Sequence, residues 1–275
     1  MFRNIVKSIT VALILVILIL GYKLINNIRI KKEIQKSNDK YITKNEETGA
    51  IEYNSDTLHV NITPIKKTNP NIEIWEVDIK VTEASQIKSA FASNEFSLSK
   101  KEKTSKISIR NNAVLAINGT AAGFNERSYV IRNGIVYKDT RLNYNPLVIQ
   151  NNGDFIIYDE QLTGEELVER VAMYTYDFGS DLIRNSEIVD YRDTWYKENL
   201  ALRTVIDQKE PLEYVILVVD VRSKASVGMS HYDISIELKN RGCYWGYNLD
   251  GGGSNTLYFD GEVLNNPSRI VERKI

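Results

Sequence analysis

The sequence of 275 residues contains few of the side chains that build zinc sites and cysteine-based active sites. It has one cysteine, Cys243, and two histidines, His59 and His231. A single cysteine excludes an intramolecular disulfide, and two histidines argue against a zinc or dinuclear site built on imidazole. Neither histidine is near Cys243 in the sequence, which disfavours a cysteine nucleophile. We therefore interpret Cys243 as a small core residue.

The sequence also lacks an excess of charge of either sign. It has 35 lysines and arginines against 36 aspartates and glutamates, which gives a formal net charge of −1. Without a basic surplus there is no reason to expect a nucleic acid partner. No motif requires a cofactor. Carboxylates and backbone carbonyls are ligands for a hard divalent cation, so metal dependence stays open.

One long apolar run lies near the N-terminus. Residues 9–20 are almost wholly apolar, and an extension to Ile25 gives the length needed to cross a bilayer. Arg3 precedes the run, as in a signal peptide, but residues 21–24 offer no convincing cleavage site. We predict an uncleaved signal anchor over residues 1–25, a charged stalk or helical extension over residues 26–50, and one globular domain over residues 51–275.

The charges that flank the apolar run do not orient it clearly. Basic residues stand on both sides, at 3 and 7 and again between 23 and 32. A large domain can be translocated against a weak charge bias. We predict a single-pass protein of the cell membrane with an extracellular C-terminal domain.

Strand patterns dominate the globular part. The alternation over residues 75–81 predicts a half-buried strand, and the apolar run Ala113–Ile117 predicts a strand buried on both faces. Three hairpins are predicted around Asn133-Gly134, residues 151–154 and Asp260-Gly261.

Helical patterns are fewer. Helices are predicted over Gly164–Met173 and over Ser230–Arg241, and Tyr214–Val221 reads as a long apolar strand. Residues 174–200 show no clear period and could be a functional loop or an irregular insertion. The predicted fold class is α+β: a strand-rich mixed sheet domain with a few helices, preceded by one N-terminal transmembrane helix.

The most informative stretch covers residues 244–268. A strand is expected to end at Asn248-Leu249-Asp250, and three glycines, Gly251–Gly253, follow directly. Glycines in a row are costly in backbone entropy and are needed where φ is positive or where the backbone approaches something closely. The stretch is therefore either a polar ligand site built on backbone N–H groups or a sharp turn with a solvated aspartate.

These residues resemble the signature of the phosphodiester glycosidase family. That signature has an Asn-Leu-Asp-Gly-Gly-Gly-Ser segment, here 248–254, then a short hairpin and an Asn-x-Pro-Ser run, here 265–268. Three upstream segments are similar to family elements in the same order: Ala116–Gly119, Arg203-Thr204 and Val218–Ser223. The resemblance implies a hydrolase of sugar-1-phosphodiesters. With the anchor, it suggests an enzyme of cell-surface glycan or exopolysaccharide metabolism.

That reaction makes particular demands on the site. The leaving group is a phosphate monoester, a weak base, so the usual pair of opposed carboxylates can be reduced to one carboxylate with preorganised donors for the phosphate. Asp250 is the candidate base or nucleophile, and its alternative role is to bond the glycine turn. Arg203 and Arg222 are candidates for a bidentate phosphate clamp or for structural ion pairs. Asp220 is a second carboxylate or the partner of an arginine.

Amides and hydroxyls supply the candidate substrate-binding groups. They are Asn118, Gly119, Asn248, Gly251, Gly252, Gly253, Ser254 and Thr256. The two asparagine side chains could hold sugar hydroxyls, which they can both donate to and accept from, or could cap strand ends. The glycine amides with the two hydroxyls could hold phosphate in a nest.

Three departures from the family pattern bear on the substrate. Thr120-Ala121-Ala122 stands where a glycine and aromatic residues are typical, so a sugar-stacking platform is missing unless Phe124 supplies it. Val221 replaces a glycine, and Val205–Asp207 replaces Ala-Ile-Gly. These changes keep an alternative open, a non-catalytic carbohydrate-binding or envelope assembly protein on the same fold.

Overall fold

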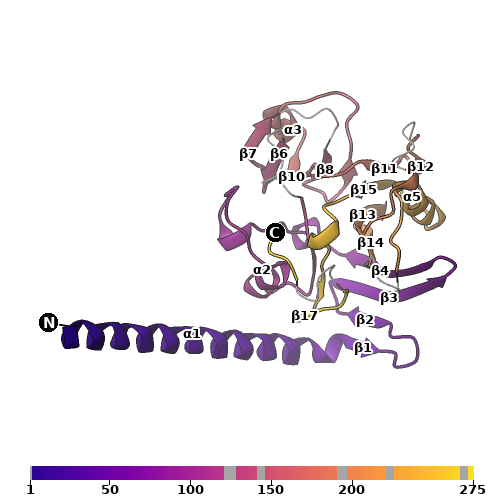
Figure 1. Ribbon diagram of the computed structural model, residues 1–275. Coiled ribbons are helices and arrows are strands. Elements are labelled where there is room, and N and C mark those ends of the chain that lie inside the picture. The colour runs from indigo at the N-terminus through magenta and orange to yellow at the C-terminus, as the bar shows by residue number, and fades with distance from the viewer. Residues whose placement is uncertain (1, 121–127, 141–145, 191–196, 221–225, 267–271) are drawn as a thin grey trace. The chain divides into compact units, whose positions relative to one another are not determined.

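The computed structural model describes residues 2–120, 128–140, 146–190, 197–220, 226–266 and 272–275 (Figure 1). The candidate residues Arg222 and Phe124, and the Pro267-Ser268 part of the signature, lie outside this description. The chain divides into two compact units, Met1–Lys40 and Tyr41–Ile275.

The first unit is one helix, α1 (Phe2–Asn38). Within it the side chains from Leu13 to Leu20 are all more than half exposed. The segment Ala12–Tyr41 contains an 18-residue window with a mean hydropathy of 1.8, which is long and apolar enough to cross a membrane, and a signal sequence meets the same criteria. The helix runs without a break through the first part of the region predicted as a stalk or helical extension.

The second unit contains three sheets, and the ladders between their named strands are all antiparallel. The nine-stranded sheet has the order β1 (Ile42–Lys44), β2 (Ile51–Asn54), β3 (Leu58–Thr68), β4 (Asn71–Val81), β14 (Glu213–Val219), β13 (Arg203–Glu210), β15 (Trp245–Asn248), β11 (Asp181–Arg184), β12 (Glu187–Ile188). The five-stranded sheet has the order β7 (Ile135–Thr140), β6 (Ser128–Arg132), β10 (Ala172–Tyr176), β8 (Leu147–Gln150), β9 (Phe155–Ile156). The three-stranded sheet has the order β17 (Glu262–Val263), β16 (Leu257–Phe259), β5 (Leu115–Ile117).

Short helices complete the second unit. The α-helices are α2 (Thr104–Arg110), α3 (Gly164–Glu169) and α5 (His231–Asn240), and the 3-10 turns are η1 (Asp39–Tyr41), η2 (Ala84–Gln86), η3 (Ala92–Asn94) and η4 (Gly252–Ser254). Helix α5 begins at the predicted cap, since the Ser230 hydroxyl accepts the Asp233 amide at 3.0 Å. It ends before Gly242, whose φ of +73° provides the left-handed residue that terminates a helix.

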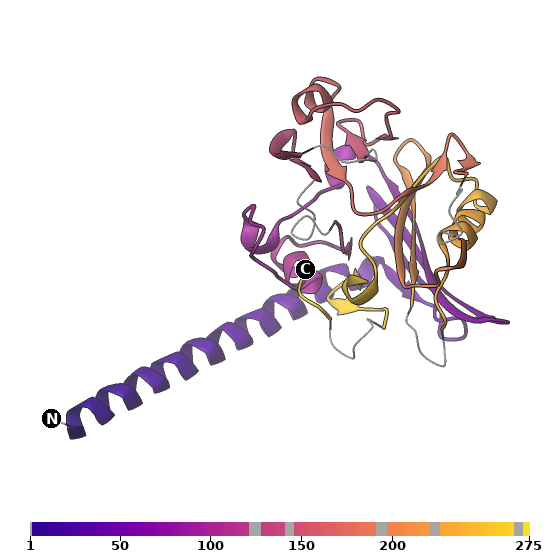
Figure 2. The ribbon, with the colours of Figure 1, turned by 45° about the horizontal axis from the view of Figure 1, so that its top comes forward.

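The nine-stranded sheet is covered on both faces (Figure 2). Ile234 and Leu238 of α5 pack on one face. On the other face, Leu257 and Phe259 of the three-stranded sheet form one cluster, and the five-stranded sheet contributes to a second. Ile117, at the end of β5, packs against both of these clusters. The end of β5 therefore lies where the three sheets meet.

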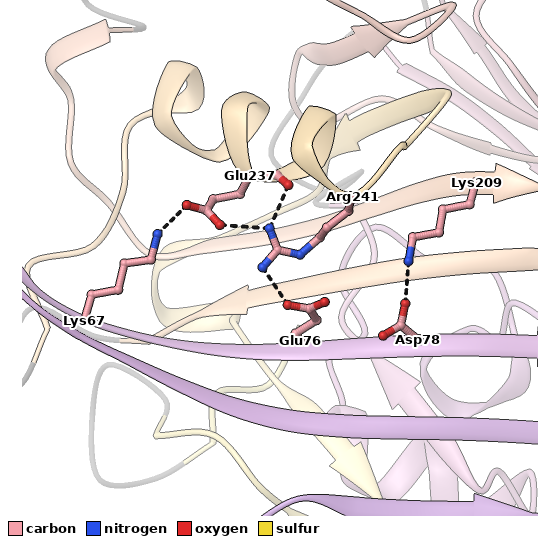
Figure 3. A network of polar contacts seen from close by, with 6 residues as sticks. All are labelled: Lys67, Glu76, Asp78, Lys209, Glu237 and Arg241. Atoms are coloured by element: carbon pink, nitrogen blue, oxygen red, sulfur yellow. Dashed lines mark hydrogen bonds and ion pairs between the residues drawn. The ribbon is translucent and has the colours of Figure 1, made fainter.

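Charged side chains fix the C-terminal end of α5 on the sheet (Figure 3). Arg241 donates to Glu76 of β4 at 2.6 Å and to Glu237 one turn earlier at 2.8 Å. Glu237 also accepts Lys67 of β3. These groups are mostly removed from solvent, with the Arg241 side chain only 16% exposed, so breaking one pair leaves a poorly solvated charge.

The α+β architecture and the three hairpins are confirmed. Asn133-Gly134 and Asp260-Gly261 each have two consecutive positive φ angles, as the favoured two-residue hairpin turns require. The loop over residues 151–154 joins β8 to β9 as predicted. The predicted strands over residues 75–81 and 214–221 correspond to β4 and β14.

Three expectations were wrong in detail. The helix predicted over Gly164–Met173 ends at Glu169, because Val171 has a φ of +60° and β10 begins at Ala172. Strand β5 is half-buried rather than buried on both faces, because it lies at the edge of a three-stranded sheet. The stretch 174–200 is not wholly irregular: it contains the end of β10, β11 and β12.

A buried carboxyl group lies in the core under α5. Asp207 of β13 is 0% exposed, and a Cβ on Gly246 of the neighbouring strand would lie 2.5 Å from its Oδ2. Burial raises the pKa of Asp207 to about 8, and the Cys243 thiol and nearby amides only partly offset this shift. None of these groups makes a hydrogen bond of normal geometry to either carboxylate oxygen. Asp207 is therefore largely protonated at neutral pH.

This burial predicts a pH-dependent stability. The unfolded carboxyl group titrates near pH 4, while the folded one holds its proton up to about pH 8, so the free energy of unfolding falls as the pH rises between these values. Asp207→Asn removes the titration. Between pH 5 and pH 8 the wild type should lose about 2–4 kcal/mol more than the variant in urea unfolding.

The exposed substitution Asp56→Asn serves as the control and should leave the wild-type pH profile unchanged. Parallel profiles for wild type and Asp207→Asn would contradict the assignment of a neutral buried acid.

Candidate functional site

A buried amide joins the three-stranded sheet to the nine-stranded sheet. Asn118 follows β5 and is 0% exposed. Its Oδ1 accepts the Thr204 hydroxyl of β13 at 2.9 Å and the Thr256 amide at 3.0 Å. Its Nδ2 donates to the carbonyl oxygen of Asp250. Three of the four hydrogen bonds that the amide can make are thus formed inside the protein.

The network continues toward the C-terminal hairpin. The Thr204 hydroxyl also lies 2.5 Å from Asn255 Oδ1, and Asn255 Nδ2 donates to Val219 O at 2.8 Å. Asn265 Nδ2 then reaches Asp220 Oδ1 at 3.1 Å. Thr204, Asn255 and Val219 are completely buried. Asn265 is 4% exposed and Asp220 is 2% exposed.

Asp220 is an anchor within this network. It is 2% exposed, and its carboxylate accepts the Trp75 indole N–H at 3.2 Å and the Asn266 amide at 3.1 Å. Burial raises the pKa of Asp220, while the Asn266 amide, Asn265 and Trp75 oppose that shift. The carboxylate thereby holds the segment after β17 against β4 and β14.

Asp250 is placed differently from Asp220. It is half-buried, and its backbone amide donates to Gly119 O at 3.1 Å. Burial raises the pKa of the Asp250 carboxyl group, and the Ser254 hydroxyl and the Arg273 charge partly offset this shift. The backbone on both sides of the side chain is thus fixed, while the residue keeps part of its surface in contact with solvent.

Glycine is required at two positions of the run for different reasons. A Cβ on Gly251 would lie 2.5 Å from Leu202 O, so the close approach of the two chains requires glycine there. Gly252 has a φ of +62°, which favours glycine. Among the hydrogen bonds between described residues, none uses the amides of Gly252 or Gly253.

Arg203 lies beside this turn but on the other face of its strand from Thr204. Its Nε donates to Met229 O at 3.1 Å, and its Nη2 donates to Asn199 O at 2.9 Å. The β13–β15 ladder pairs Val205 with Asn248. Continued by two residues, the same register places the backbone of Asp250 alongside Arg203.

His231 is the neighbour of Arg203 that the sequence analysis did not single out. Its Nε2 lies 3.1 Å from Arg203 Nη1, and because a guanidinium only donates, Nε2 is the acceptor. Burial and the charge of Arg203 lower the pKa of His231 to about 3. The imidazole is therefore neutral, and Arg203 keeps a full positive charge while it is 6% exposed.

The remaining candidates line or support the same strand ends. Asn248 is 3% exposed and packs against Gly179, where a Cβ would meet its Nδ2 at 2.6 Å. Ser254 and Thr256 are also buried, and the Thr256 hydroxyl donates to Ser254 O at 3.1 Å. Thr256 therefore belongs to the interior network rather than to an open surface.

The structure thus brings most of the sequence candidates together. Asn118, Gly119, Asp250 and the glycine run form one site, with Arg203 and Asn248 on the neighbouring strands. Asp220 is linked to it only through intervening side chains. Sequence reasoning gave no role to Thr204, Asn255 or Asn265, although Thr204 and Asn265 stand inside the quoted motifs and Asn255 directly follows one of them.

Two of the depressions in the described part of the chain bear on the choice of site. A groove of about 240 Å³, lined by residues of β2, β3, β4, β13 and β14, contains none of the candidate residues. A smaller one of about 130 Å³ is lined by Asp220, Trp75 and Asn266, among others. We favour the motif-bearing strand ends over the larger groove, because the polar residues there converge from four separate segments. In the described ranges no three acidic, histidine or cysteine side chains come together as a metal site.

Comparison with known proteins gives a family match over this region. The model of the phosphodiester glycosidase family matches residues 111–275. The chain is 28% identical over 225 residues to the SPbeta prophage-derived uncharacterized protein YomE of Bacillus subtilis (strain 168). That match covers 74% of this chain and 35% of YomE, so the chain spans about a third of the length of this curated relative.

Two solved structures share the fold. One is the zebrafish N-acetylglucosamine-1-phosphodiester alpha-N-acetylglucosaminidase catalytic domain, auto-inhibited by its pro-peptide, with a TM-score of 0.60, 17% identity and 78% coverage of each chain. The other is a hypothetical protein from Synechocystis, with a TM-score of 0.63, 11% identity, and coverage of 82% of this chain and 62% of that one. At these identities the likeness concerns the fold.

The Asn118 network generates a prediction for stability. Asn118→Ala leaves the Thr256 amide without its buried acceptor and the Asp250 carbonyl without its donor. Each lost partner is costly in the interior, so the free energy of unfolding should fall by about 2–4 kcal/mol in urea titrations at pH 7. Asn61→Ala, at an exposed position of β3, should change it by less than about 0.5 kcal/mol. Equal effects of the two substitutions would show that Asn118 does not hold the sheets together.

Proposed function

We propose that this chain, which belongs to the phosphodiester glycosidase family by a match over more than half of its length, hydrolyses sugar-1-phosphodiesters. Water would attack the anomeric carbon, the bond from that carbon to the phosphate oxygen would break, and free sugar and a phosphate monoester would leave. The observation that carries the proposal is the meeting of one accessible carboxylate, a buried arginine and unused glycine amides at adjoining strand ends.

Asp250 is our candidate for the reacting carboxylate. It is more accessible than Asp220, whose oxygens already accept several hydrogen bonds. The raised pKa of Asp250 makes its carboxylate a better base than a solvated one. As base it would take the proton of the attacking water, and as nucleophile it would bond the anomeric carbon first.

Arg203 and the glycine run are our candidates for the phosphate site. A phosphodiester carries negative charge, and the charge developing on the leaving oxygen is stabilised by fixed donors. The His231 imidazole beside Arg203 is neutral. The amides of Gly252 and Gly253 supply further donors. Arg222 remains a proposed second clamp, from sequence alone.

Asp220 has a supporting role in this proposal. Its bonds to Asn265 and Asn266 hold the segment that follows the signature hairpin. Asn118 and Gly119 position the backbone of Asp250 in the same way. Asn248 and Ser254 are buried beside the site, so each would contact a sugar hydroxyl only through the edge of its side chain.

The proposed cellular location is based on the N-terminal helix. As an uncleaved anchor, α1 would hold the enzyme at the cell membrane with its C-terminal unit outside. Surface glycans or exopolysaccharides joined through phosphodiesters would then be the accessible substrates. A non-catalytic glycan-binding role is the competing proposal, favoured by the altered residues after Gly119.

Hydrolysis by the full chain in detergent micelles tests the proposal. The substrates are a panel of sugar-1-phosphodiesters that includes an N-acetylglucosamine-1-phospho-alkyl ester, with and without EDTA. Wild type should release free sugar. Asp250→Asn should lower the rate by at least about a hundredfold, since it removes the base or nucleophile, and should keep thermal stability nearly unchanged.

Asp56→Asn is the matched control at an exposed position and should keep full activity. Full activity of Asp250→Asn would show that Asp250 is neither the base nor the nucleophile. Binding without release of sugar from any substrate would favour the non-catalytic alternative, and loss of activity in EDTA would reveal a required divalent cation.

A further inference from the structure

We propose that an aromatic platform made by Phe91, Phe96 and Tyr137 binds the sugar chain that extends from the reacting phosphodiester. The proposal rests on the proposed function for the identity of its ligand. It adds a second contact surface for the substrate, outside the motif-bearing site. None of the three residues belongs to the signature segments.

The segment that carries two of these rings is held in a strained and strongly bonded turn. Ser93 and Asn94 have consecutive positive φ angles of 56° and 61°. Such angles are unfavourable for residues other than glycine and persist where surrounding contacts impose them. We call residues 91–96 the aromatic turn.

Arg110 of α2 supplies those contacts. It donates to Phe91 O at 3.0 Å and to Asn94 Oδ1 at 2.9 Å. It also contacts both oxygens of Glu102, at 2.7 and 2.6 Å, and Glu102 accepts the Ser93 amide at 2.9 Å. Because Arg110 holds this turn through hydrogen bonds to it and to Glu102, the two aromatic rings of the turn are held in position before a ligand binds.

The three rings pack around one point, with Phe91 and Tyr137 edge to face and the other two pairs tilted. The centroid of Tyr137 lies 5.0 Å from that of Phe91 and 5.4 Å from that of Phe96, and the two phenylalanines are 5.6 Å apart. Tyr137 is 40% exposed and stands on β7, the edge strand of the five-stranded sheet. Ile135, two residues earlier on the same strand face, is 56% exposed. The platform therefore presents apolar surface and one phenol group to solvent.

A row of contacts connects the platform with the candidate site. The Arg132 guanidinium lies 5.8 Å from the Phe91 centroid and 5.0 Å from the Tyr176 centroid. Tyr176 in turn lies against Gly119, where an added Cβ would be 3.4 Å from its ring. Gly119 accepts the Asp250 amide. The platform is thus linked to the candidate site by a short row of residues, of which Tyr176 and Gly119 are partly exposed.

Sugar chemistry fits this surface. A pyranose ring has one face of C–H groups, which suits the negative face of an aromatic ring, and hydroxyls at its rim. The platform combines fixed rings with the Tyr137 hydroxyl, and the Ser97 and Ser99 hydroxyls stand close by in the chain. Rigid aromatic residues lose little conformational entropy on binding, so they suit a weakly held flexible chain.

Calorimetric titration of the full chain tests the platform. The protein is kept in lauryldimethylamine oxide, a detergent without sugar, and the probes are tetra-N-acetylchitotetraose and maltotetraose. At least one should bind the wild type. Tyr137→Ala should weaken that binding about five- to tenfold, because a stacking ring is lost, while Tyr137→Phe should stay within about twofold of wild type.

Tyr244→Ala is the matched control, since Tyr244 is 43% exposed and packs edge to face on Trp245 away from the aromatic turn. It should bind like wild type. The proposal is overturned if neither tetrasaccharide binds the wild type or if Tyr137→Ala binds as tightly. The probes contain no phosphodiester, so Tyr137-dependent binding without any hydrolysis of sugar-1-phosphodiesters would contradict the proposed function and leave the platform intact.

Discussion

One buried side chain amide holds the candidate site in place. Asn118 is completely buried where the three sheets meet, and it contacts a hydroxyl of β13, the backbone before β16 and the carbonyl of Asp250. Unpaired amides are expensive in the interior, so these contacts select one relative position of the two sheets. The position of the proposed reacting carboxylate follows from that choice, because Asp250 is bonded through its backbone on both sides.

Because successive side chains of a strand point to opposite faces, the structural residue of β13 and its candidate binding residue lie on different faces of the sheet. Thr204 and Arg203 are neighbours on β13 and their side chains point to opposite faces of the sheet. The first completes the buried network, and the second lies with His231 beside the glycine turn. The close approach at Gly251 brings the turn against the start of β13. A short Arg-Thr pair thereby contributes both the scaffold and a candidate phosphate ligand.

Much of this organisation could be predicted from the sequence, because it depends on local patterns. The hairpin at Asn133-Gly134 and the cap at Ser230 follow from turn and capping chemistry, and the glycine run indicated the candidate site. The different surroundings of Asp220 and Asp250 could not be predicted. Asp220 and Asp250 both end apolar strands, and only tertiary contacts show that one is consumed by hydrogen bonds. The aromatic turn was missed for the same reason, since Arg110 orders it from a helix without a strong sequence signal.

The central claim is that the phosphodiester binds between Asp250, the glycine turn and Arg203. A crystal structure of the full chain with a non-hydrolysable sugar-1-phosphonate tests it directly. The account predicts that the phosphonate oxygens lie within hydrogen-bonding distance of the Gly252 and Gly253 amides and of Arg203, with the anomeric carbon next to the Asp250 carboxylate. A phosphonate bound in the groove lined by β2, β3, β4, β13 and β14, or against Asp220 with Asp250 left in solvent, would contradict it.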